Sequence, residues 1–444
     1  MIDANLRSKG SYTVQEMKII RSKGRGFSEF ISRILNRGTS VVPGVEGSVR
    51  AIIDDVRLRG DRAVAEYTKK FDGVDLRGRI EVKKKEIDRA FKKIPEKDVN
   101  LLELAASRIE AFARRQLQNS WFFTDPDGTT LGTRITPLER VGIYVPGGKA
   151  SYPSTVLMNA VPARVAGVGE VFMATPPGRG EVNPYVLAAA RIAGVDRVFR
   201  TGGAQAVAAF AYGTKTVPAV DKITGPGNIY VATAKRLVYG KVDIDMIAGP
   251  SEILVINDGT GEPSWMAADL LSQAEHDELA SSMLITTSQK TARAVKAEVE
   301  RQIKKLSPVR RGIAVASIAN YGAIITVKDL DEAAAISNRL APEHLELFVE
   351  RPFEALGLIR NAGAVFLGAN TPEAAGDYLA GPNHTLPTGG TARFSSPLGV
   401  EDFVKRTSVI GFSAKGIKAL GKSIERFAEL EGLEAHAKSV KIRT

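Results

Sequence analysis

The sequence predicts an α/β protein with two similar domains, each built around a parallel β-sheet, and with helical segments at both ends. From residue 140 onward, short apolar runs alternate with helical patterns. This alternation is typical of parallel sheets covered by helices on both faces. In addition, residues 171–175 and 283–287 are two comparable apolar runs, and each begins such a series.

The first 120 residues are expected to be mostly helical. A basic segment broken at Gly24 and Gly26 is interpreted as an arm, and the next helical pattern is broken at Gly60. The expected elements are helices at 1–40, 49–71 and 98–117 and a short strand at 79–82.

The alternation that follows is expected to give two series of elements. The first contains strands at 140–145, 171–174, 195–200 and 222–224 and helices at 186–193, 206–211 and 229–238. The second contains segments at 283–286, 292–303, 323–327, 330–340, 345–349, 353–359 and 364–367. Residues 415–439 then form a charged helical tail that carries His436. Chain ends are usually dispensable, so a histidine there suggests docking onto another subunit.

Composition restricts the classes of function. With 444 residues, 44% hydrophobic and 25% charged, the chain can form two or three ordinary globular domains. No apolar run suits a signal peptide or a membrane span, so we expect a cytoplasmic protein without a membrane partner. The absence of cysteine excludes disulfides, thiolate zinc sites and cysteine-held iron–sulfur clusters. Acidic residues accompany the lysine runs at 83–85 and 304–305, so the net charge of +11 favours a solvated surface over nucleic-acid binding.

A group of potential metal ligands lies near the middle of the chain. The apolar residues between 265 and 271 recur at helical spacing, which would place Gln273 and His276 on one face, where both could reach one cation. The alternative is that His276 hydrogen-bonds at a helix end. The other histidines, His344, His384 and His436, also lie in unusual polar stretches.

Three glycine-rich turns follow predicted strands, at residues 145–149, 201–205 and 225–228. Backbone amides at such turns favour phosphate groups. The first turn lacks the leading glycine of a Walker A loop, and Tyr230 replaces the last glycine of the dinucleotide fingerprint in the third. Spacing alone therefore leaves a nucleotide site open.

Several longer motifs resemble the histidinol dehydrogenase family. They lie at residues 225–235, 245–252, 273–276 (Gln-Ala-Glu-His), 341–344 (Ala-Pro-Glu-His), 376–378 and 381–387 (Gly-Pro-Asn-His-Thr-Leu-Pro). The resemblance implies an NAD-dependent, four-electron oxidation of L-histidinol to L-histidine through histidinal, the last steps of histidine biosynthesis. It also implies one zinc ion per subunit and an intertwined homodimer with shared active sites.

Site residues follow from the resemblance, position by position. The implied zinc ligands are Gln273, His276, Asp377 and His436, the last from the partner subunit, and the metal is expected to hold the substrate. The implied substrate contacts are Ser251, Gln273, His276, His344, Asp377, His384, Glu431 and His436. The implied NAD contacts are Tyr144, Gln205 and Asn228, one at each glycine turn. From the residues alone, Ser251 could equally be a turn cap and Glu431 part of a solvated helix face.

Glu343 and His344 would be the acid–base pair. Oxidation of an alcohol needs a base, and the pKa of histidine suits that role. Without cysteine no thiohemiacetal can form, so water must add to histidinal, and Glu343 is the natural base to activate it. Ordinary hydrogen bonds at both residues are the structural alternative.

The resemblance also implies two Rossmann-like domains and suggests where each begins and ends. We expect an arm at 1–40, a first α/β domain at 41–120 and 252–390 with the metal and acid–base residues, a second, NAD-binding domain at 121–251, and a helical tail at 391–444 that reaches the partner. Two other functions are considered. One is a zinc- and NAD-dependent dehydrogenase of the same scaffold acting on another small hydroxy compound, and the other is a basic nucleic-acid-binding protein that kept the scaffold, which would bind in a salt-sensitive way.

Overall fold

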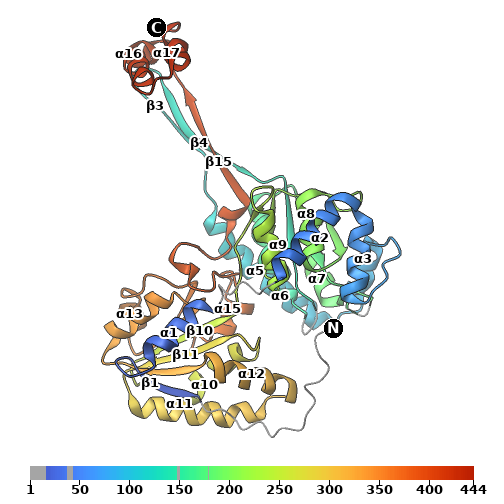
Figure 1. Cartoon of the computed structure of the whole chain (residues 1–444), viewed down its shortest axis with the longest axis vertical. Coiled ribbons are helices and arrows are strands. Elements are labelled where there is room, and N and C mark those ends of the chain that lie inside the picture. The colour runs from blue at the N-terminus through green and yellow to red at the C-terminus, as the bar shows by residue number, and fades with distance from the viewer. Residues whose placement is uncertain (1–16, 38–43, 148–150, 179) are drawn as a thin grey trace.

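The structure is a computed structural model that describes residues 17–37, 44–147, 151–178 and 180–444. Two six-stranded sheets form the body of the molecule, and a three-stranded sheet projects from it (Figure 1).

The first sheet is entirely parallel, and its strands are mostly apolar. Every residue of β10 (Glu252–Asn257), in the middle of this sheet, is buried, because helices cover both faces of the sheet. Its order is β1 (Lys18–Arg21), β12 (Ala323–Thr326), β11 (Ser281–Thr286), β10 (Glu252–Asn257), β13 (His344–Phe348) and β14 (Ala364–Leu367).

The second sheet repeats this arrangement. Its order is β2 (Glu81–Val82), β7 (Arg197–Arg200), β6 (Glu170–Thr175), β5 (Arg140–Tyr144), β8 (Lys222–Thr224) and β9 (Asp243–Ile244), and only the edge strand β2 is antiparallel. In the first sheet β10, β11 and β12 lie side by side in chain order, and β13 and β14 continue on the other side of β10. In the second sheet β5, β6 and β7 are arranged in the same way, with β8 and β9 on the other side of β5. The chain therefore changes direction between β10 and β13 and between β5 and β8. This shared order confirms the prediction of two similar parallel-sheet domains.

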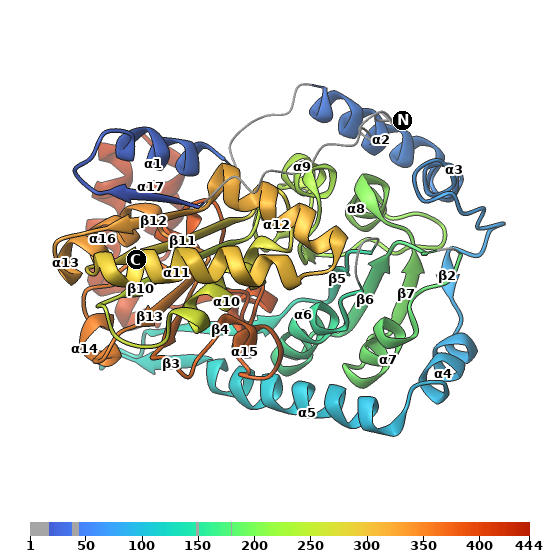
Figure 2. The ribbon, with the colours of Figure 1, turned by 90° about the horizontal axis from the view of Figure 1, so that it is seen from below.

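Helices cover both faces of each sheet (Figures 1 and 2). On the first sheet, one face carries α10 (Pro263–Ala274), α11 (Gln289–Gln302) and α12 (Pro308–Tyr321), and the other carries α1 (Phe27–Asn36), α13 (Leu330–Leu340) and α14 (Pro352–Leu356). On the second sheet, α4 (Lys84–Lys92), α5 (Glu96–Ala113), α6 (Pro153–Ala166) and α7 (Pro184–Ile192) face α2 (Val45–Arg59), α3 (Asp61–Asp72), α8 (Gly203–Tyr212) and α9 (Ile229–Val238). Short 3-10 turns lie at Arg114–Gln116, Ile303–Lys305, Thr391–Arg393 and Val400–Phe403.

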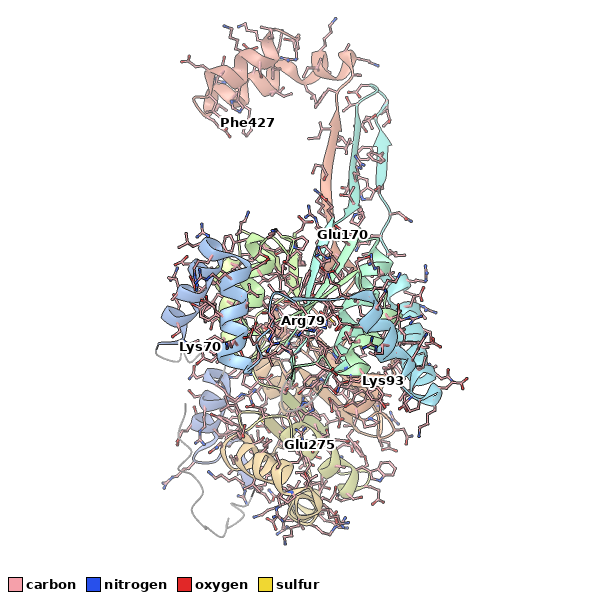
Figure 3. The ribbon with its side chains drawn as sticks, turned by 90° about the vertical axis from the view of Figure 1, so that its right-hand side faces the viewer. Lys70, Arg79, Lys93, Glu170, Glu275 and Phe427 are labelled. Carbon is pink, nitrogen blue, oxygen red and sulfur yellow. The ribbon has the colours of Figure 1, made fainter. Side chains whose placement is uncertain are left out.

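The projecting sheet leads to the C-terminal helices. It consists of β3 (Trp121–Thr124), β4 (Thr130–Pro137) and β15 (Val404–Gly411), and β4 pairs along its whole length with β15. The helices α16 (Ala414–Leu430) and α17 (Glu434–Lys441) lie at its far end, away from the body (Figures 1 and 3). We refer to β3, β4, β15, α16 and α17 together as the arm module.

Three predicted domain limits need correction. Residues 41–120 were assigned to the first domain, but α2 to α5 pack on the second sheet, because a helical period shows that a face is buried and not which sheet covers it. The arm predicted at 1–40 contains β1 and α1, which belong to the core of the first domain; residues 1–16 and 38–40 of this prediction lie outside the described residues. The tail predicted at 391–444 is helical only from α16 onward, since β15 is a long strand.

Candidate active site

The predicted acid–base residues lie where the first sheet changes direction. Glu343 directly precedes β13, His344 is its first residue, and Glu252 is the first residue of the adjacent strand β10. The helix α13 ends at Leu340, and the residue that follows it, Ala341, is a buried non-glycine residue with a φ of 48°. This left-handed residue turns the chain sharply, so that Glu343 and His344 enter the sheet edge side by side.

Glu252 and Glu343 hold one another by reciprocal hydrogen bonds. The N–H of Glu252 donates to Oε2 of Glu343 at 2.8 Å, and the N–H of Glu343 donates to Oε2 of Glu252 at 3.2 Å. Both side chains are buried. Burial raises the pKa of Glu343 well above its ordinary value, and the nearby carboxylate of Glu252 adds to the effect. The position of Glu343 is thus fixed by backbone and side-chain contacts together.

The His344 ring is held by one edge and open at the other. Its Nδ1 atom lies 2.9 Å from the carbonyl oxygen of Glu252 and 2.9 Å from Nε2 of Gln273. Its buried Nε2 atom has no hydrogen-bond partner among the described residues, and its nearest carboxylates are those of Glu373 at 3.8 Å and Asp377 at 3.9 Å. Burial lowers the pKa of His344, so the ring is neutral and can accept a proton at neutral pH.

Carboxyl groups crowd the open side of His344. Glu373 and Asp377 lie four residues apart on α15 (Glu373–Tyr378), and burial raises the pKa of Glu373 to about 7 and that of Asp377 to about 6. Behind them, the N–H of Glu373 donates to Glu346 at 2.9 Å, and Glu346 is hydrogen-bonded to Asp269. Burial also raises the pKa of Glu346 and that of Asp269, the latter to about 6. Such a concentration of acidic groups favours a bound cation.

His344, Glu373 and Asp377 offer one ligand atom each within 4.8 Å of one another. Oε1 of Glu373 is buried and, like Nε2 of His344, has no hydrogen-bond partner in the described ranges. Nitrogen and carboxylate oxygen are ligands that zinc accepts. The donor set therefore fits a divalent metal ion.

The structure brings some of the predicted metal ligands together and leaves one elsewhere. Gln273 and Asp377 both lie beside His344. His276 lies just beyond α10, which ends at Ala274 rather than continuing to His276 as expected, but its N–H still donates to the carbonyl of Gln273 at 3.2 Å. Its side chain is exposed, and charge repulsion from it contributes to lowering the pKa of His344 and of His384, so it lies near both residues. His436 is exposed on α17, at the end of the arm module.

The predicted substrate contacts divide in the same way. His384 is held by the carbonyl of Asp377, 3.0 Å from its Nδ1, and by Thr155 of α6, 3.4 Å from its Nε2, so it joins the two domains. Ser251 directly precedes Glu252 and is half-buried. Glu431 is exposed and follows α16 at the end of the arm module. One chain alone does not bring Glu431 or His436 to His344.

Sequence reasoning missed several residues of this site: Arg37, Glu252, Asp269, Glu346 and Glu373. Only one signal pointed to them, since Glu373 stands four residues before Asp377, on the same face of a helix. Arg37 and Glu252 are separated by 215 residues, so no local pattern links them.

The three predicted cofactor contacts lie at the carboxyl edge of the second sheet. Tyr144 ends β5, and its hydroxyl accepts from the N–H of Gly203 at 3.1 Å; burial raises its pKa to about 12. Gln205 is buried in α8 with Oε1 lacking a partner within the described part of the chain. Asn228 caps α9 by accepting from the N–H groups of Tyr230 and Val231. This edge, at the change of direction between β5 and β8, is where open α/β sheets bind ligands.

The turn before α9 is tightly built. A Cβ atom on Gly225, whose φ is 107°, would lie 2.1 Å from the carbonyl oxygen of Tyr144. Lys235 donates to the carbonyl of Gly225 at 2.9 Å and pairs with the buried Asp245, which in turn accepts from the Gly225 N–H at 2.8 Å. The first predicted turn continues into Gly148 and Lys149, which lie outside the described residues.

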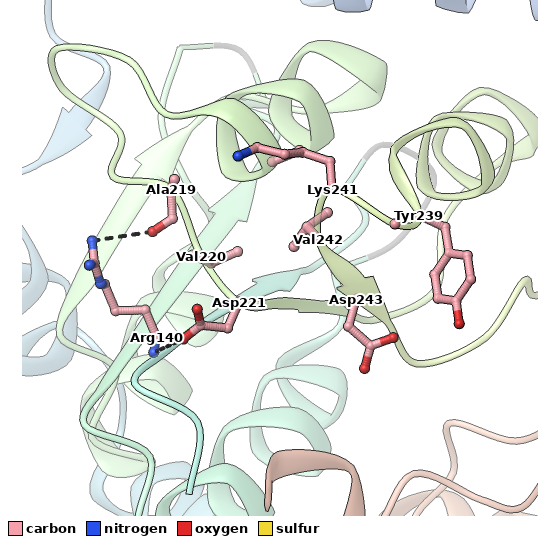
Figure 4. A pocket seen from close by; sticks show the side chains of 10 residues that line it. Arg140, Ala219, Val220, Asp221, Tyr239, Lys241, Val242 and Asp243 are labelled. Atoms are coloured by element: carbon pink, nitrogen blue, oxygen red, sulfur yellow. Dashed lines mark hydrogen bonds between the residues drawn. The ribbon is translucent and has the colours of Figure 1, made fainter. Parts of the chain in front are cut away.

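A surface cavity of about 540 Å³ lies at the opposite edge of the second sheet. Arg140 and Asp221 line it at the amino ends of β5 and β8, with Tyr239, Lys241 and Asp243 on the other side (Figure 4). None of the predicted site residues lines this cavity. The candidate site therefore lies away from this cavity, at the edge of the first sheet next to the second domain.

Known proteins with this architecture decide the family. A family model described as histidinol dehydrogenase matches residues 35–444. The histidinol dehydrogenase of Geobacter metallireducens is 61% identical over 429 residues, which cover 96% of this chain and 98% of that protein. That of Aquifex aeolicus is 53% identical over 425 residues, covering 96% and 98%.

The chain belongs to the histidinol dehydrogenase family. The family resemblance predicted from the motifs is confirmed, and with it the prediction of an oxidoreductase. The crystal structure of histidinol dehydrogenase from Elizabethkingia anophelis has a TM-score of 0.90 to this structure at 37% identity, and the match covers 96% of this chain and 98% of that chain. This structure therefore shares its fold with that histidinol dehydrogenase over nearly the whole chain. Among the residues described here, no helix is both long and apolar enough to cross a membrane.

Proposed function

We propose that this protein oxidises L-histidinol through histidinal to L-histidine with NAD as the oxidant, in the last steps of histidine biosynthesis. The overall reaction converts one alcohol, two NAD⁺ and one water into one carboxylate, two NADH and three protons. The observation that carries the proposal is the fixed pair of Glu343 and His344 beside the unpartnered carboxyl oxygen of Glu373. Membership of the histidinol dehydrogenase family supports the choice of substrate.

His344 is the proposed base of the alcohol oxidation. Its lowered pKa keeps the ring neutral at neutral pH, and its Nε2 edge is free to take the hydroxyl proton as the hydride leaves carbon for NAD. In this state Nδ1 carries the ring proton and donates it to the carbonyl of Glu252, which holds the ring in one orientation during the transfer. A neutral, oriented imidazole is what a general base near pH 7 requires.

Glu343 is the proposed base for the second oxidation. The chain has no cysteine, so the aldehyde must be hydrated before a second hydride can leave. Glu343 removes a proton from the attacking water, and the geminal diol then loses its second hydride to another NAD. Burial raises the pKa of Glu343, so positive charge brought into the loaded site would favour its ionised, basic form.

A zinc ion fits the cluster of carboxyl groups around His344. Two observations support this: Oε1 of Glu373 has no hydrogen-bond partner among the described residues, and burial raises the pKa of both Glu373 and Asp377. The proposed ligands of one ion per subunit are Gln273, His276 and Asp377, completed by His436 of the partner subunit. When bound, the metal would hold the substrate in position. The proposed substrate contacts are Ser251, Gln273, His276, His344, Asp377, His384, and Glu431 and His436 of the partner subunit.

The NAD site proposed here is the carboxyl edge of the second sheet. Tyr144, Gln205 and Asn228 lie at three turns of that edge, and the Oε1 atom of Gln205 offers an acceptor without a partner in the described ranges. Backbone amides at the starts of α8 and α9 favour the cofactor pyrophosphate. The substrate site faces this domain through the His384–Thr155 contact.

A homodimer with shared active sites is proposed because the arm module exposes large apolar side chains. Trp121, Phe122 and Phe123 of β3 are 55%, 53% and 48% exposed, and Phe427 of α16 is 65% exposed (Figure 3). A patch of this kind on a projecting element marks a protein interface. The same module carries Glu431 and His436, so a partner that covers it would also receive these residues.

We further propose that the enzyme works in the cytoplasm and needs neither nucleic acid nor membrane. A second candidate function is oxidation of a different small hydroxy compound on the same scaffold. The exposed Glu431, which could pair with a substrate ammonium or imidazolium group, favours histidinol.

The deciding experiment counts NADH formed per L-histidinol consumed, before and after chelation and after zinc is returned. Two NADH per histidinol, with activity that depends on zinc, are expected. One NADH per substrate would remove the hydration step, and no turnover by the zinc-loaded protein would favour the second candidate. A panel of small alcohols then identifies the substrate.

A further inference from the structure

Arg37 is a buried cation that the proposed reaction does not use. It directly follows α1, and its side chain is only 1% exposed. Its guanidinium donates to Oε1 of Glu252 at 2.6 Å and to the carbonyl of Pro250 at 3.2 Å, and it stacks 5.6 Å from the ring centre of Tyr321. A cation kept so far from water normally has a specific partner to neutralise.

That partner, Glu252, contacts both members of the acid–base pair. Its Oε1 accepts from Arg37 and from the N–H of Gly389 at 3.1 Å, and its Oε2 accepts from the N–H of Glu343. Its own N–H donates to the Glu343 carboxylate, and its carbonyl meets Nδ1 of His344. The side chain of Glu252 therefore serves Arg37 and Glu343, while its carbonyl serves His344.

We propose that Arg37 and Glu252 are positioning residues for the hydration of histidinal, acting through Glu343. Arg37 balances the charge of the Glu252 carboxylate and fixes its orientation, and Glu252 in turn fixes Glu343. This inference rests on the proposed role of Glu343 as the base that activates water.

Loss of Arg37 would leave Glu252 as an uncompensated buried charge. The carboxylate of Glu252 would then rotate or bind water, and the N–H of Glu343 would lose its hydrogen-bond acceptor. General-base catalysis is sensitive to displacements of about 1 Å. His344 is less affected, because the backbone carbonyl of Glu252 remains in β10, paired with β11 and β13.

The effect is therefore expected to differ between the two oxidations. Arg37→Met should lower kcat for histidinal roughly 10- to 100-fold, with little change in KM, and should slow histidinol oxidation to the aldehyde only a few-fold. The matched control is Arg33→Met, one turn earlier on α1, where the side chain is exposed, pairs with Glu29 and donates to the carbonyl of Asn320 at 3.4 Å. This control should leave both steps unchanged.

Combining substitutions separates positioning from a general fold defect. Glu252→Gln alone strands the Arg37 cation, whereas Arg37→Met with Glu252→Gln removes both charges and keeps an oxygen at position 252 that accepts from the Glu343 N–H. The double variant should recover histidinal oxidation to within about threefold of the unmodified enzyme, because the two sites interact directly. Losses that simply add, or that affect both oxidations equally, would overturn the inference.

Two further measurements keep the test decisive. If Arg37→Met does not fold, as judged by thermal unfolding, Arg37→Lys keeps the charge but replaces the guanidinium, whose Nη2 atom donates to both Glu252 and Pro250, with a shorter ammonium group, and it should show a smaller loss of the same selective kind. Glu343→Gln is assayed in parallel. If Glu343→Gln is selective for histidinal and the Arg37 variants are not, the inference alone fails; if Glu343→Gln is not selective, the proposed role of Glu343 and the inference fail together.

Discussion

Nε2 of His344 lies 3.8 Å from Oε1 of Glu373, and both buried atoms lack a hydrogen-bond partner among the residues described. Two unsatisfied polar atoms facing each other in a protein interior are costly without a bound group between or beside them. Their separation is too long for a direct hydrogen bond and suits a shared ion, water or substrate atom. The relationship between these two residues therefore supports the proposed location of the active site.

The first prediction concerns the base that activates water. Glu343→Gln keeps the size of the side chain and removes its basicity, so kcat for histidinal should fall by about 10²–10⁴. Oxidation of histidinol to the aldehyde should fall much less, because His344 serves that step. Rapid measurement of NADH with each substrate supplied separately checks this. Glu350→Gln, an exposed change just after β13, is the control, and equal loss in both steps would argue against hydration by Glu343.

Metal content gives the second prediction. His276→Asn and Asp377→Asn should each lower the zinc bound after dialysis and lower activity in proportion, because each removes one proposed ligand. Glu373→Gln is the informative comparison, since Glu373 is one of the cluster of carboxyl residues around His344 but is not among the proposed zinc ligands. Retention of zinc by Glu373→Gln and its loss from His276→Asn support the proposed set. Loss of zinc from Glu373→Gln together with its retention by His276→Asn would instead assign the metal to His344, Glu373 and Asp377.

The stability of the metal-free protein gives the third prediction. The folded-state pKa values of Glu373 and Asp377, about 7 and about 6, lie above those of unfolded carboxyl groups. The folded state therefore binds more protons, so the free energy of unfolding is highest below about pH 4 for these groups and falls as pH rises to about 7. Thermal unfolding of chelated protein should show this decline, which Glu373→Gln should reduce and added zinc should offset. A pH-independent midpoint between pH 5 and 7 would contradict it.

The sequence predicted most strands of the two sheets because buried parallel strands leave a clear pattern, but it missed the fully buried β10 and the short edge strand β9. The strands β6, β11 and β12 are continuous apolar runs bounded by polar residues, and helices with regular periods separate them. The edge strand β1 was missed because its four residues include a basic residue at each end. The strands β4 and β15 were missed because they project into solvent and bury no continuous apolar run in one chain.

The site was predicted where its members are close in sequence or carry family motifs. Gln273 and His276 are three residues apart, and Glu343 and His344 are adjacent, so both pairs can be recognised locally. Contacts such as that between Arg37 and Glu252 depend on how α1 packs beside β10, which no local pattern encodes. Likewise, the burial that raises the pKa of Glu373 is a property of the folded chain and not of the residue.

The last prediction tests whether active sites are shared between subunits. A His436→Ala chain and a Glu343→Gln chain should each be nearly inactive toward histidinal when alone, but a heterodimer would contain one site with Glu343 from the first chain and His436 from the second. Random mixing should restore about a quarter of full activity, since half of the dimers would be mixed and half of their sites intact.

A matched control for this experiment mixes His276→Asn with Glu343→Gln. Both residues lie in the body of the same chain, so no heterodimer could contain an intact site, and activity should stay at background. Activity in the first mixture with none in the second would show that the arm module carries His436 into the partner's site. If neither mixture recovers activity although mass spectrometry detects heterodimers, each chain must complete its own site, and the exposed position of His436 on α17 would need another explanation.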